Sequence, residues 1–194
     1  LIVKVTYSDL KNKRVFISGG GSGIGATIVE HFCEQKSEVY FIDIDVRSSN
    51  KLIKNIKKKG FKIPKFIECN ILDIKKLQNI IKDIISKKGP IHCLINSAAN
   101  DDRHSTEQVD EKYWENRMGI NLKHYFFAAQ GVVKGMKKIK SGSIVNLSSV
   151  SWMLGEGDKV VYETAKSAVV GLTRSFAQEF GKYNIRTNSV IPGS

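Results

Sequence analysis

The sequence has few cysteines and no long apolar run. Its 3 cysteines, Cys33, Cys69 and Cys93, are odd in number and far apart, which predicts buried, reduced thiols and not a disulfide framework. No apolar run approaches the ~20 residues of a membrane-spanning helix. The opening segment LIVKVTYSDLKNKR has too short an apolar stretch for a secretory signal. We therefore expect a cytoplasmic protein with no membrane partner.

Arginine is also scarce, although the formal net charge is +12. The basic residues are mostly lysines spread over many segments, which is typical of solvated helix faces. A groove for nucleic acid would favour arginine with interleaved aromatic residues, so we expect no nucleic-acid partner. The 4 histidines show no ligand spacing with the cysteines, so no metal site is predicted.

Short apolar runs alternate with longer amphipathic segments along the whole chain. The runs, rich in β-branched and aromatic residues, predict strands over 14–18, 38–43, 64–69, 91–96, 143–148 and 185–191. Helical periodicity predicts helices over 23–36, 48–59, 73–87, 107–138 and 160–181. This alternation predicts an α/β protein with a Rossmann-like, doubly wound parallel sheet and helices on both faces. Without repeats or linkers, residues 1–194 are expected to form one domain.

A glycine-rich segment, SGGGSGIGA, follows the first predicted strand. Gly21, Gly23 and Ala26 fit the pattern G-x-G-x-x-G/A, and Asp43 lies 20 residues after Gly23. Glycines let the backbone approach a pyrophosphate, and the following helix offers free N–H groups. The segment therefore predicts a dinucleotide site, although a glycine turn without a ligand has the same local sequence.

The end of the second predicted strand bears on the choice of cofactor. The Asp43 carboxylate can accept hydrogen bonds from a ribose and would repel a 2′-phosphate. The glycine loop has Ser22 where a basic residue could stand, Ile44 follows Asp43, and Arg47 is the only nearby cation. We therefore expect NAD, with NADP less favoured. Asp43 could instead only solubilise the strand end, and Asp45 could take its role.

Several short motifs occur in one fixed order. They are SGGGSGIG (18–25), NSAA (96–99), INL (120–122), SS (148–149), YETAK (162–166) and PG (192–193). Over its whole length the chain resembles the short-chain dehydrogenase/reductase family. The resemblance implies a nicotinamide-dependent oxidoreductase that acts on the CH–OH group of a small-molecule substrate. It also implies a homo-oligomer, a dimer or tetramer.

The resemblance assigns a catalytic role to four residues. Tyr162 would be the acid/base, and Lys166, one helical turn later on the same face, would lower its pKa together with the positive nicotinamide ring. Ser149, thirteen residues before the tyrosine, would hydrogen-bond the substrate oxygen. Asn121 would anchor a water that passes protons to Lys166. Singly, Ser149 could only cap a strand end and Asn121 could only kink or cap a helix.

The spacing of tyrosine and lysine is not specific by itself. Tyr7 and Lys11 have the same spacing, but no strand or serine precedes them. The family motifs also imply cofactor contacts, namely Gly19, Gly21, Ser22, Gly23, Ile24, Gly25, Asp43, Asn70, Ile71, Asn96, Ala98, Tyr162, Lys166, Pro192 and Gly193. Asn70 stands where the family usually has Asp, and Ser97 and Ala99 replace Asn and Gly of its N-N-A-G element.

Three stretches resemble a narrower group, the bacterial pentose dehydrogenases of the D-xylose type. They are NDDRH (100–104), residues 112–130 and residues 149–166. This resemblance implies oxidation of an aldopentose at its anomeric carbon to the lactone. The substrate contacts expected are Asn100, Asp102, Ser149, Ser151, Trp152 and Tyr162. Alternatively, NDDRH is a polar loop held by internal salt bridges.

Two other functions remain open. One is a short-chain reductase of the same family that acts on an acyl or cyclic ketone or alcohol. The other is a fragment that binds cofactor without turnover. The sequence lacks an initiating Met and stops soon after the apolar run SVI. Because relatives continue into a seventh strand, we expect the chain to be truncated, with the final strand missing.

Overall fold

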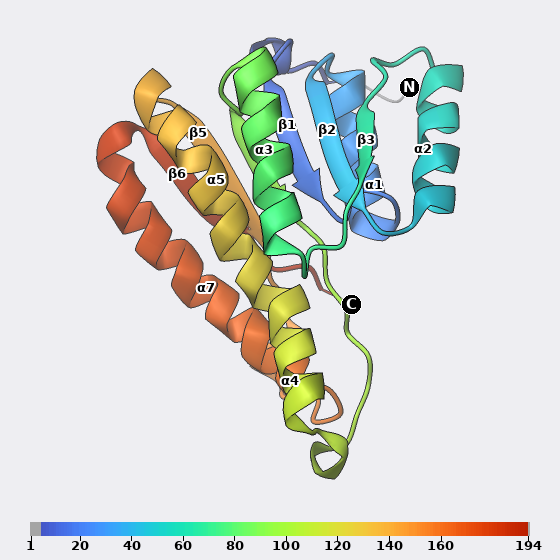
Figure 1. Ribbon diagram of the computed structural model, residues 1–194, viewed down its shortest axis with the longest axis vertical. Coiled ribbons are helices and arrows are strands. Elements are labelled where there is room, and N and C mark those ends of the chain that lie inside the picture. The colour runs from blue at the N-terminus through green and yellow to red at the C-terminus, as the bar shows by residue number, and fades with distance from the viewer. Residues whose placement is uncertain (1–4, 194) are drawn as a thin grey trace.

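The computed structural model describes residues 5–193 and contains one parallel sheet. The strands are β1 (Arg14–Ser18), β2 (Glu38–Asp43), β3 (Lys65–Glu68), β4 (Cys93–Asn96), β5 (Gly142–Leu147) and β6 (Ile185–Val190). Their order is β3-β2-β1-β4-β5-β6, and every pair is parallel (Figure 1). The predicted doubly wound sheet is confirmed, with strand ends shifted by at most two residues.

Helices cover both faces of the sheet, as predicted. They are α1 (Gly23–Glu34), α2 (Val46–Lys58), α3 (Ile74–Lys88), α4 (Glu111–Met118), α5 (His124–Ile139), α6 (Ser151–Leu154) and α7 (Val160–Phe180). Figure 1 shows α3, α5 and α7 side by side on the viewer's side of the strands, with α1 behind β2. Because both faces are covered, Val15, Phe16 and Ile17 of β1 are all fully buried.

The helix α3 shows how the sequence determines an element locally. Leu77, Ile81 and Ile84 recur at helical spacing and are buried in the core, as the periodicity predicts. The Asp73 side chain caps the start by accepting a hydrogen bond from the Lys76 amide at 2.9 Å. Gly89 follows the last turn with a φ of 90°, a conformation that ends the helix.

The single helix predicted over 107–138 is wrong. A 3-10 turn (Thr106–Gln108), α4, a π-helical turn (Gly119–Lys123) and α5 occupy that range. The π turn contains Asn121, whose side chain hydrogen-bonds the backbone of Asn100 across the loop after β4. A π turn inserts a residue without ending the apolar stripe, so periodicity alone did not reveal it.

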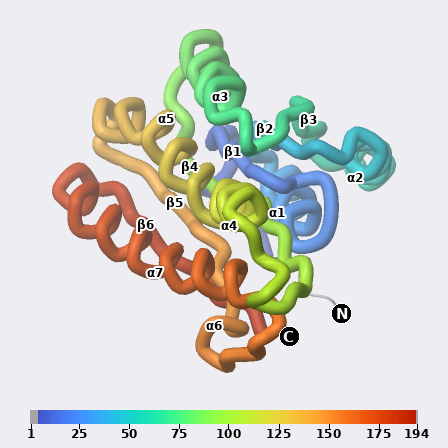
Figure 2. The backbone as a smooth tube through the Cα atoms, turned by 60° about the horizontal axis from the view of Figure 1, so that its bottom comes forward, coloured from blue at the N-terminus to red at the C-terminus, as the bar shows by residue number. Residues whose placement is uncertain are grey.

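The site is placed by the sheet topology. β2 and β3 lie on one side of β1, and β4, β5 and β6 lie on the other, so the strand order reverses between β1 and β4. The loops that follow these two strands run in opposite directions, and a crevice opens between them at the carboxyl ends of the strands. Figure 2 shows α4, α6 and the first turns of α7 beyond this end of the sheet. Across residues 5–193, no helix combines the length and apolar character that a membrane crossing requires. Cys33, Cys69 and Cys93 are free thiols, the first two buried.

Candidate active site

A cavity of about 700 Å³ lies in this crevice. Segments that are far apart in the sequence line it. The lining residues are Gly19, Ser22, Gly23, Ile24, Gly25, Asp43, Ile44, Asp45, Cys69, Asn70, Ile71, Ser97, Ala98, Ala99, Asn100, Asp101, Ile120, Leu147, Ser148, Tyr162, Lys166 and Pro192. The cavity therefore unites the glycine loop, the end of β2, the loop after β4 and the first turns of α7.

The glycine loop packs too closely against the neighbouring backbone to carry side chains at two of its positions. Gly19 has a φ of 69°, and a Cβ atom there would stand 2.5 Å from the Cα atom of Ala98. A Cβ atom on Gly25 would overlap the carbonyl oxygen of Gly19. Gly23, at the start of α1, lines the cavity and has nothing within 4 Å of an added Cβ atom, so backbone amides there are open to a dinucleotide pyrophosphate.

The Asp43 carboxylate holds the glycine loop against the end of β2. Its Oδ2 accepts a hydrogen bond from the Gly21 amide at 2.8 Å, and its Oδ1 accepts one from the Asp45 amide at 2.9 Å. Asp45 also lines the cavity and caps α2, and its bonds to Ser48 lower its pKa. Among the described lining residues the only Lys or Arg is Lys166, at the opposite end. This end therefore suits an uncharged ribose better than a phosphate.

Lys166 is buried on the catalytic face of α7, with a side chain only about 1% exposed. Its Nζ donates hydrogen bonds to the Leu147 carbonyl at 2.7 Å and to the Tyr125 hydroxyl at 3.0 Å. Burial lowers the pKa of the ammonium to about 7, and the nearby Asp101 carboxylate opposes this shift. Lys166 can therefore gain or lose a proton near neutral pH.

Tyr162 lies beside Lys166, as the helical spacing predicts. The Lys166 Nζ is 5.5 Å from the centroid of the Tyr162 ring. Burial raises the pKa of the phenol, a hydrogen bond from Ser149 lowers it, and Asp101 raises it. The pKa of the phenol is thus raised in the free protein, and its expected lowering by Lys166 together with the nicotinamide ring stays a prediction. Burial is the largest cause of the raised pKa, because it disfavours the charged phenolate.

The side chains of Ser149 and Asn121 form hydrogen bonds with nearby residues. The Ser149 Oγ is 2.9 Å from the Ser151 Oγ and accepts a hydrogen bond from the Ser151 amide at 3.2 Å. The fully buried Asn121 donates to the Asn100 carbonyl and accepts from the Asn100 amide, both at 2.9 Å. Its side chain is thus directed at the loop after β4 and not at Lys166, so its water-anchoring role stays a prediction.

Several predicted contacts do not line the cavity within the described chain. For the cofactor they are Gly21, Asn96 and Gly193, and for the substrate Asp102, Ser149, Ser151 and Trp152. Asn96 is fully buried, and it donates a hydrogen bond to the Asn146 Oδ1 at 2.9 Å, which joins β4 to β5. Asp102 forms an ion pair with Arg117 at 2.5 Å. Ser151 is buried against Ser149.

The cavity also includes residues outside the predicted set of contacts, of which Asp45 is the alternative to Asp43 named above and Asp101 lies in the segment NDDRH. They are Ile44, Asp45, Cys69, Ser97, Ala99, Asp101, Ile120, Leu147 and Ser148. Most of them directly follow or end a strand, and position at a strand's carboxyl end is the signal that could have found them. Ser148 donates a hydrogen bond to the Lys166 carbonyl at 2.7 Å, which ties α7 to the end of β5.

Comparison with known proteins gives consistent matches. Residues 13–194 match the family described as short chain dehydrogenase. The chain is 41% identical over 189 residues to D-xylose 1-dehydrogenase of Caulobacter vibrioides, which covers 97% of this chain and 74% of that protein. It is 37% identical over 187 residues to the "Probable galactose dehydrogenase GalD" of Rhizobium meliloti, covering 96% and 73%.

A solved structure agrees with these matches. The ligand-free aldohexose dehydrogenase of Thermoplasma acidophilum superposes with a TM-score of 0.85 at 29% identity, covering 97% of this chain and 69% of that one. The cavity, its glycine loop and the Tyr162–Lys166 pair fit a nicotinamide dinucleotide and a CH–OH substrate. The chain belongs to the short-chain dehydrogenase family, and it is an oxidoreductase that acts on CH–OH donors with a nicotinamide cofactor.

Proposed function

We propose that this protein is an NAD-dependent sugar dehydrogenase that oxidises the anomeric C–OH of an aldopentose to the lactone. The observation that carries the proposal is the single cavity that Asp43, Tyr162, Lys166, Asn100 and Asp101 all line. It joins a ribose-binding end to an acid/base pair and to polar groups suited to a polyol. The relatives named for xylose, galactose and aldohexose support a sugar substrate.

The residues that would hold the cofactor lie along the cavity in order. Asp43 would accept hydrogen bonds from the adenosine ribose, the α1 amides would meet the pyrophosphate, and Lys166 lies where the nicotinamide end is expected. When bound, NAD accepts a hydride from the substrate carbon. Among the described residues no lysine or arginine lines the Asp43 end of the cavity, although Arg47 is close enough to lower the pKa of Asp45, and the Asp43 carboxylate would repel a 2′-phosphate, which supports NAD over NADP.

Tyr162 would take the proton of the substrate hydroxyl on its phenol oxygen. Because burial raises the pKa of this phenol, it is a protonated acid in the free protein. The hydrogen bond from Ser149 favours the phenolate, and so would additional positive charge in the cavity. Lys166, with a pKa of about 7, can then supply or receive a proton on its Nζ.

Asn100 and Asp101 are the groups best placed for sugar hydroxyls. The backbone amide and carbonyl of Asn100 both hydrogen-bond the Asn121 side chain, which ties Asn100 to the π-helical turn that precedes α5. Asp101 lines the cavity, and its charge raises the pKa of both Tyr162 and Lys166, which supports a position close to this pair. Because Asp101 lines the cavity and Asp102 does not, we propose Asp101 as a further substrate contact, and its negative charge would disfavour anionic substrates.

The cofactor proposal is tested by Asp43→Ser. We expect the unchanged chain to bind NAD more tightly than NADP in calorimetric titrations, and Asp43→Ser to narrow that preference. Asp83→Ser is the matched control, because it makes the same replacement on the exposed face of α3, and it should keep the preference for NAD over NADP. Tighter binding of NADP by the unchanged protein would overturn the proposal.

The substrate proposal is tested by turnover with NAD. D-xylose and another aldopentose should be oxidised faster than a β-keto acyl thioester is reduced with NADH. The reverse order would favour the acyl reductase alternative, and cofactor binding without any turnover would favour the inactive fragment. The homo-oligomer and the cytoplasmic location stay predictions.

A further inference from the structure

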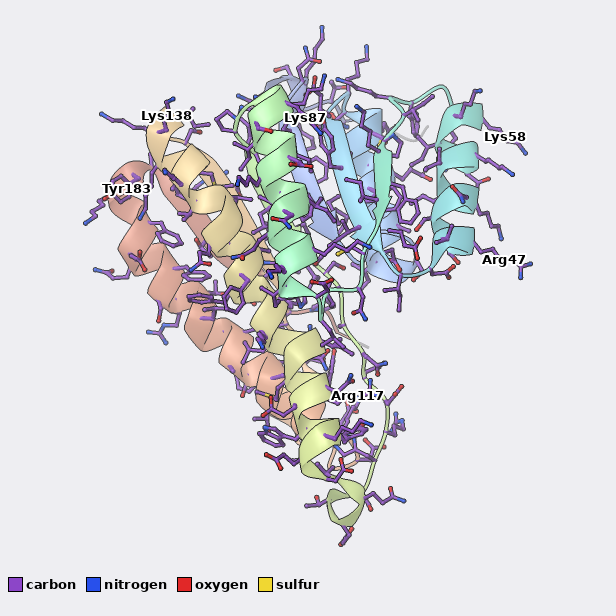
Figure 3. All side chains as sticks on the ribbon, in the orientation of Figure 1. Arg47, Lys58, Lys87, Arg117, Lys138 and Tyr183 are labelled. Carbon is purple, nitrogen blue, oxygen red and sulfur yellow. The ribbon has the colours of Figure 1, made fainter. Side chains whose placement is uncertain are left out.

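The segment NDDRH, which follows β4, divides into two halves with different surroundings. Asn100 and Asp101 line the cavity. The next three residues contact other elements: Asp102 pairs with Arg117 of α4, Arg103 pairs with Asp158, and the His104 amide donates to the Asp158 carbonyl at 2.7 Å. Figure 3 shows Arg117 reaching from α4 toward this segment. The second half of the segment therefore joins α4 to the residues before α7.

The His104 side chain contacts the start of the helix that carries Tyr162. Its Nε2 accepts a hydrogen bond from the Val161 amide at 3.3 Å. Val161 is the second residue of α7, and Lys159, at the N-cap position, makes no side-chain capping bond. The first amides of a helix lack partners within the helix. His104 therefore supplies, from 57 residues away, the cap that α7 lacks locally.

The contacts of the imidazole determine which nitrogen carries the proton. An Nε2 atom that accepts from an amide has no hydrogen, so the hydrogen must be on Nδ1. The Nδ1 atom lies 3.0 Å from the Asp102 carbonyl and 2.9 Å from the Tyr113 hydroxyl. The Tyr113 ring packs edge-on against the imidazole with centroids 5.0 Å apart, and the Arg117 guanidinium lies 4.8 Å from the Tyr113 ring centroid.

We propose that His104 is a positioning residue for Tyr162, acting as a neutral Nδ1–H imidazole that caps α7. The tyrosine directly follows the capped residue, so a frayed first turn would move the phenol relative to Ser149 and Lys166. The effect on turnover rests on the proposed function, whereas the tautomer and the helix cap do not.

Nuclear magnetic resonance of the ¹⁵N-labelled full chain tests the cap without turnover. Long-range ¹H–¹⁵N spectra at mildly alkaline pH distinguish the two tautomers, and the His104 signals are assigned by their loss in His104→Gln. We expect the Nδ1–H form for His104 and slow exchange of the Val161 amide. In His104→Phe that amide should exchange at least about tenfold faster, which is a loss of ~1.4 kcal/mol of protection. An Nε2–H tautomer, or unchanged exchange, would overturn the proposal.

Kinetics with matched variants test the positioning role. His104→Phe keeps a ring against Tyr113 but removes the acceptor, so kcat should fall by roughly 10–10²-fold while KM for NAD stays near its original value. His104→Gln, whose side-chain oxygen can accept from Val161, should recover part of the loss. His31→Phe, at an exposed histidine of α1, is the control.

The kinetic outcomes separate the two proposals. Equal kcat for His104→Phe and the unchanged protein, or no recovery in His104→Gln, would overturn the positioning role. If the unchanged protein oxidises no sugar, the proposed function fails, and the tautomer and amide exchange still decide whether His104 caps α7.

Discussion

Lys166 is the residue whose environment is least typical of its type. Lysines are almost never fully buried unless paired, yet this ammonium lies against the Leu147 carbonyl and the Tyr125 hydroxyl. Burial lowers its pKa from the ordinary 10.5 to about 7. Between these values the unfolded chain binds more protons than the folded one, so stability rises with pH through this window.

Replacing Lys166 with Met tests this linkage. The gain in unfolding free energy of Lys166→Met relative to the unchanged protein should be largest below pH 7 and shrink as pH rises toward 10.5. Urea unfolding at several pH values measures it. Lys54→Met, on the exposed face of α2, is the control, and its effect on the unfolding free energy should not shrink as pH rises from 7 to 10.5. A pH-independent difference for Lys166→Met would show that the ammonium is not desolvated.

The role of Tyr162 is tested by removing one oxygen. Tyr162→Phe keeps the ring beside Lys166 but removes the proton acceptor, so kcat should fall by about 10²-fold or more, with NAD affinity nearly unchanged. Steady-state kinetics and calorimetry measure the two quantities. Tyr7→Phe, at an exposed tyrosine with the same spacing to a lysine, should have no effect. Near-normal turnover in Tyr162→Phe would exclude the mechanism.

At the scale of elements, the packing of α1 against the glycine loop decides whether the cofactor site forms. Gly25 is buried inside α1, and any side chain there would overlap the Gly19 carbonyl. Gly171 lies inside α7 with nothing within 4 Å of its added Cβ atom. The same substitution therefore has opposite consequences in the two helices.

Gly25→Ala should displace the loop from α1 and lower NAD affinity by at least about tenfold, because even one strained contact costs over ~1 kcal/mol. Gly171→Ala should keep NAD affinity and raise the unfolding free energy by up to ~1 kcal/mol, since alanine favours a helix over glycine. Calorimetric titration and urea unfolding measure both. Unchanged NAD affinity in Gly25→Ala would contradict the described packing.

At the scale of the whole molecule, a buried polar chain joins the sheet to the catalytic helix. The Asn96 amide donates to Asn146 Oδ1 at 2.9 Å, and the Asn146 amide donates to Thr173 Oγ1 at 2.9 Å. The Thr173 hydroxyl in turn donates to the Val169 carbonyl at 2.7 Å. β4, β5 and α7 are therefore held in one arrangement by bonds that a purely apolar interface lacks.

Thr173→Val should destabilise the protein by ~1–3 kcal/mol, because the shape is kept but the buried Asn146 amide loses its acceptor. Urea unfolding measures the change. Thr27→Val is the matched control, because this exposed threonine also donates to a carbonyl one turn earlier in its helix. Its substitution should cost less than about 0.5 kcal/mol. Equal effects of the two variants would show that the polar chain contributes nothing to stability.

Local sequence determined a large part of this protein. Strand composition and helical periodicity predicted all the strands and helices such as α3, because a period of 2 or 3.6 depends only on neighbouring residues. Local sequence also predicted that Gly23 begins α1. It predicted that Tyr162 and Lys166 share a face of α7, because they are one helical turn apart. These features follow from backbone geometry within a few residues.

Only the tertiary structure decided the surroundings of those residues. Asp101, and not Asp102, lines the cavity because Arg117 of α4 pairs with Asp102. Lys166 donates to the Tyr125 hydroxyl and the Leu147 carbonyl, and burial raises the pKa of Tyr162 in the free protein. Such outcomes depend on which distant groups come within hydrogen-bonding distance and on how much water they exclude. The spacing of residues along the chain does not predict these contacts between distant residues.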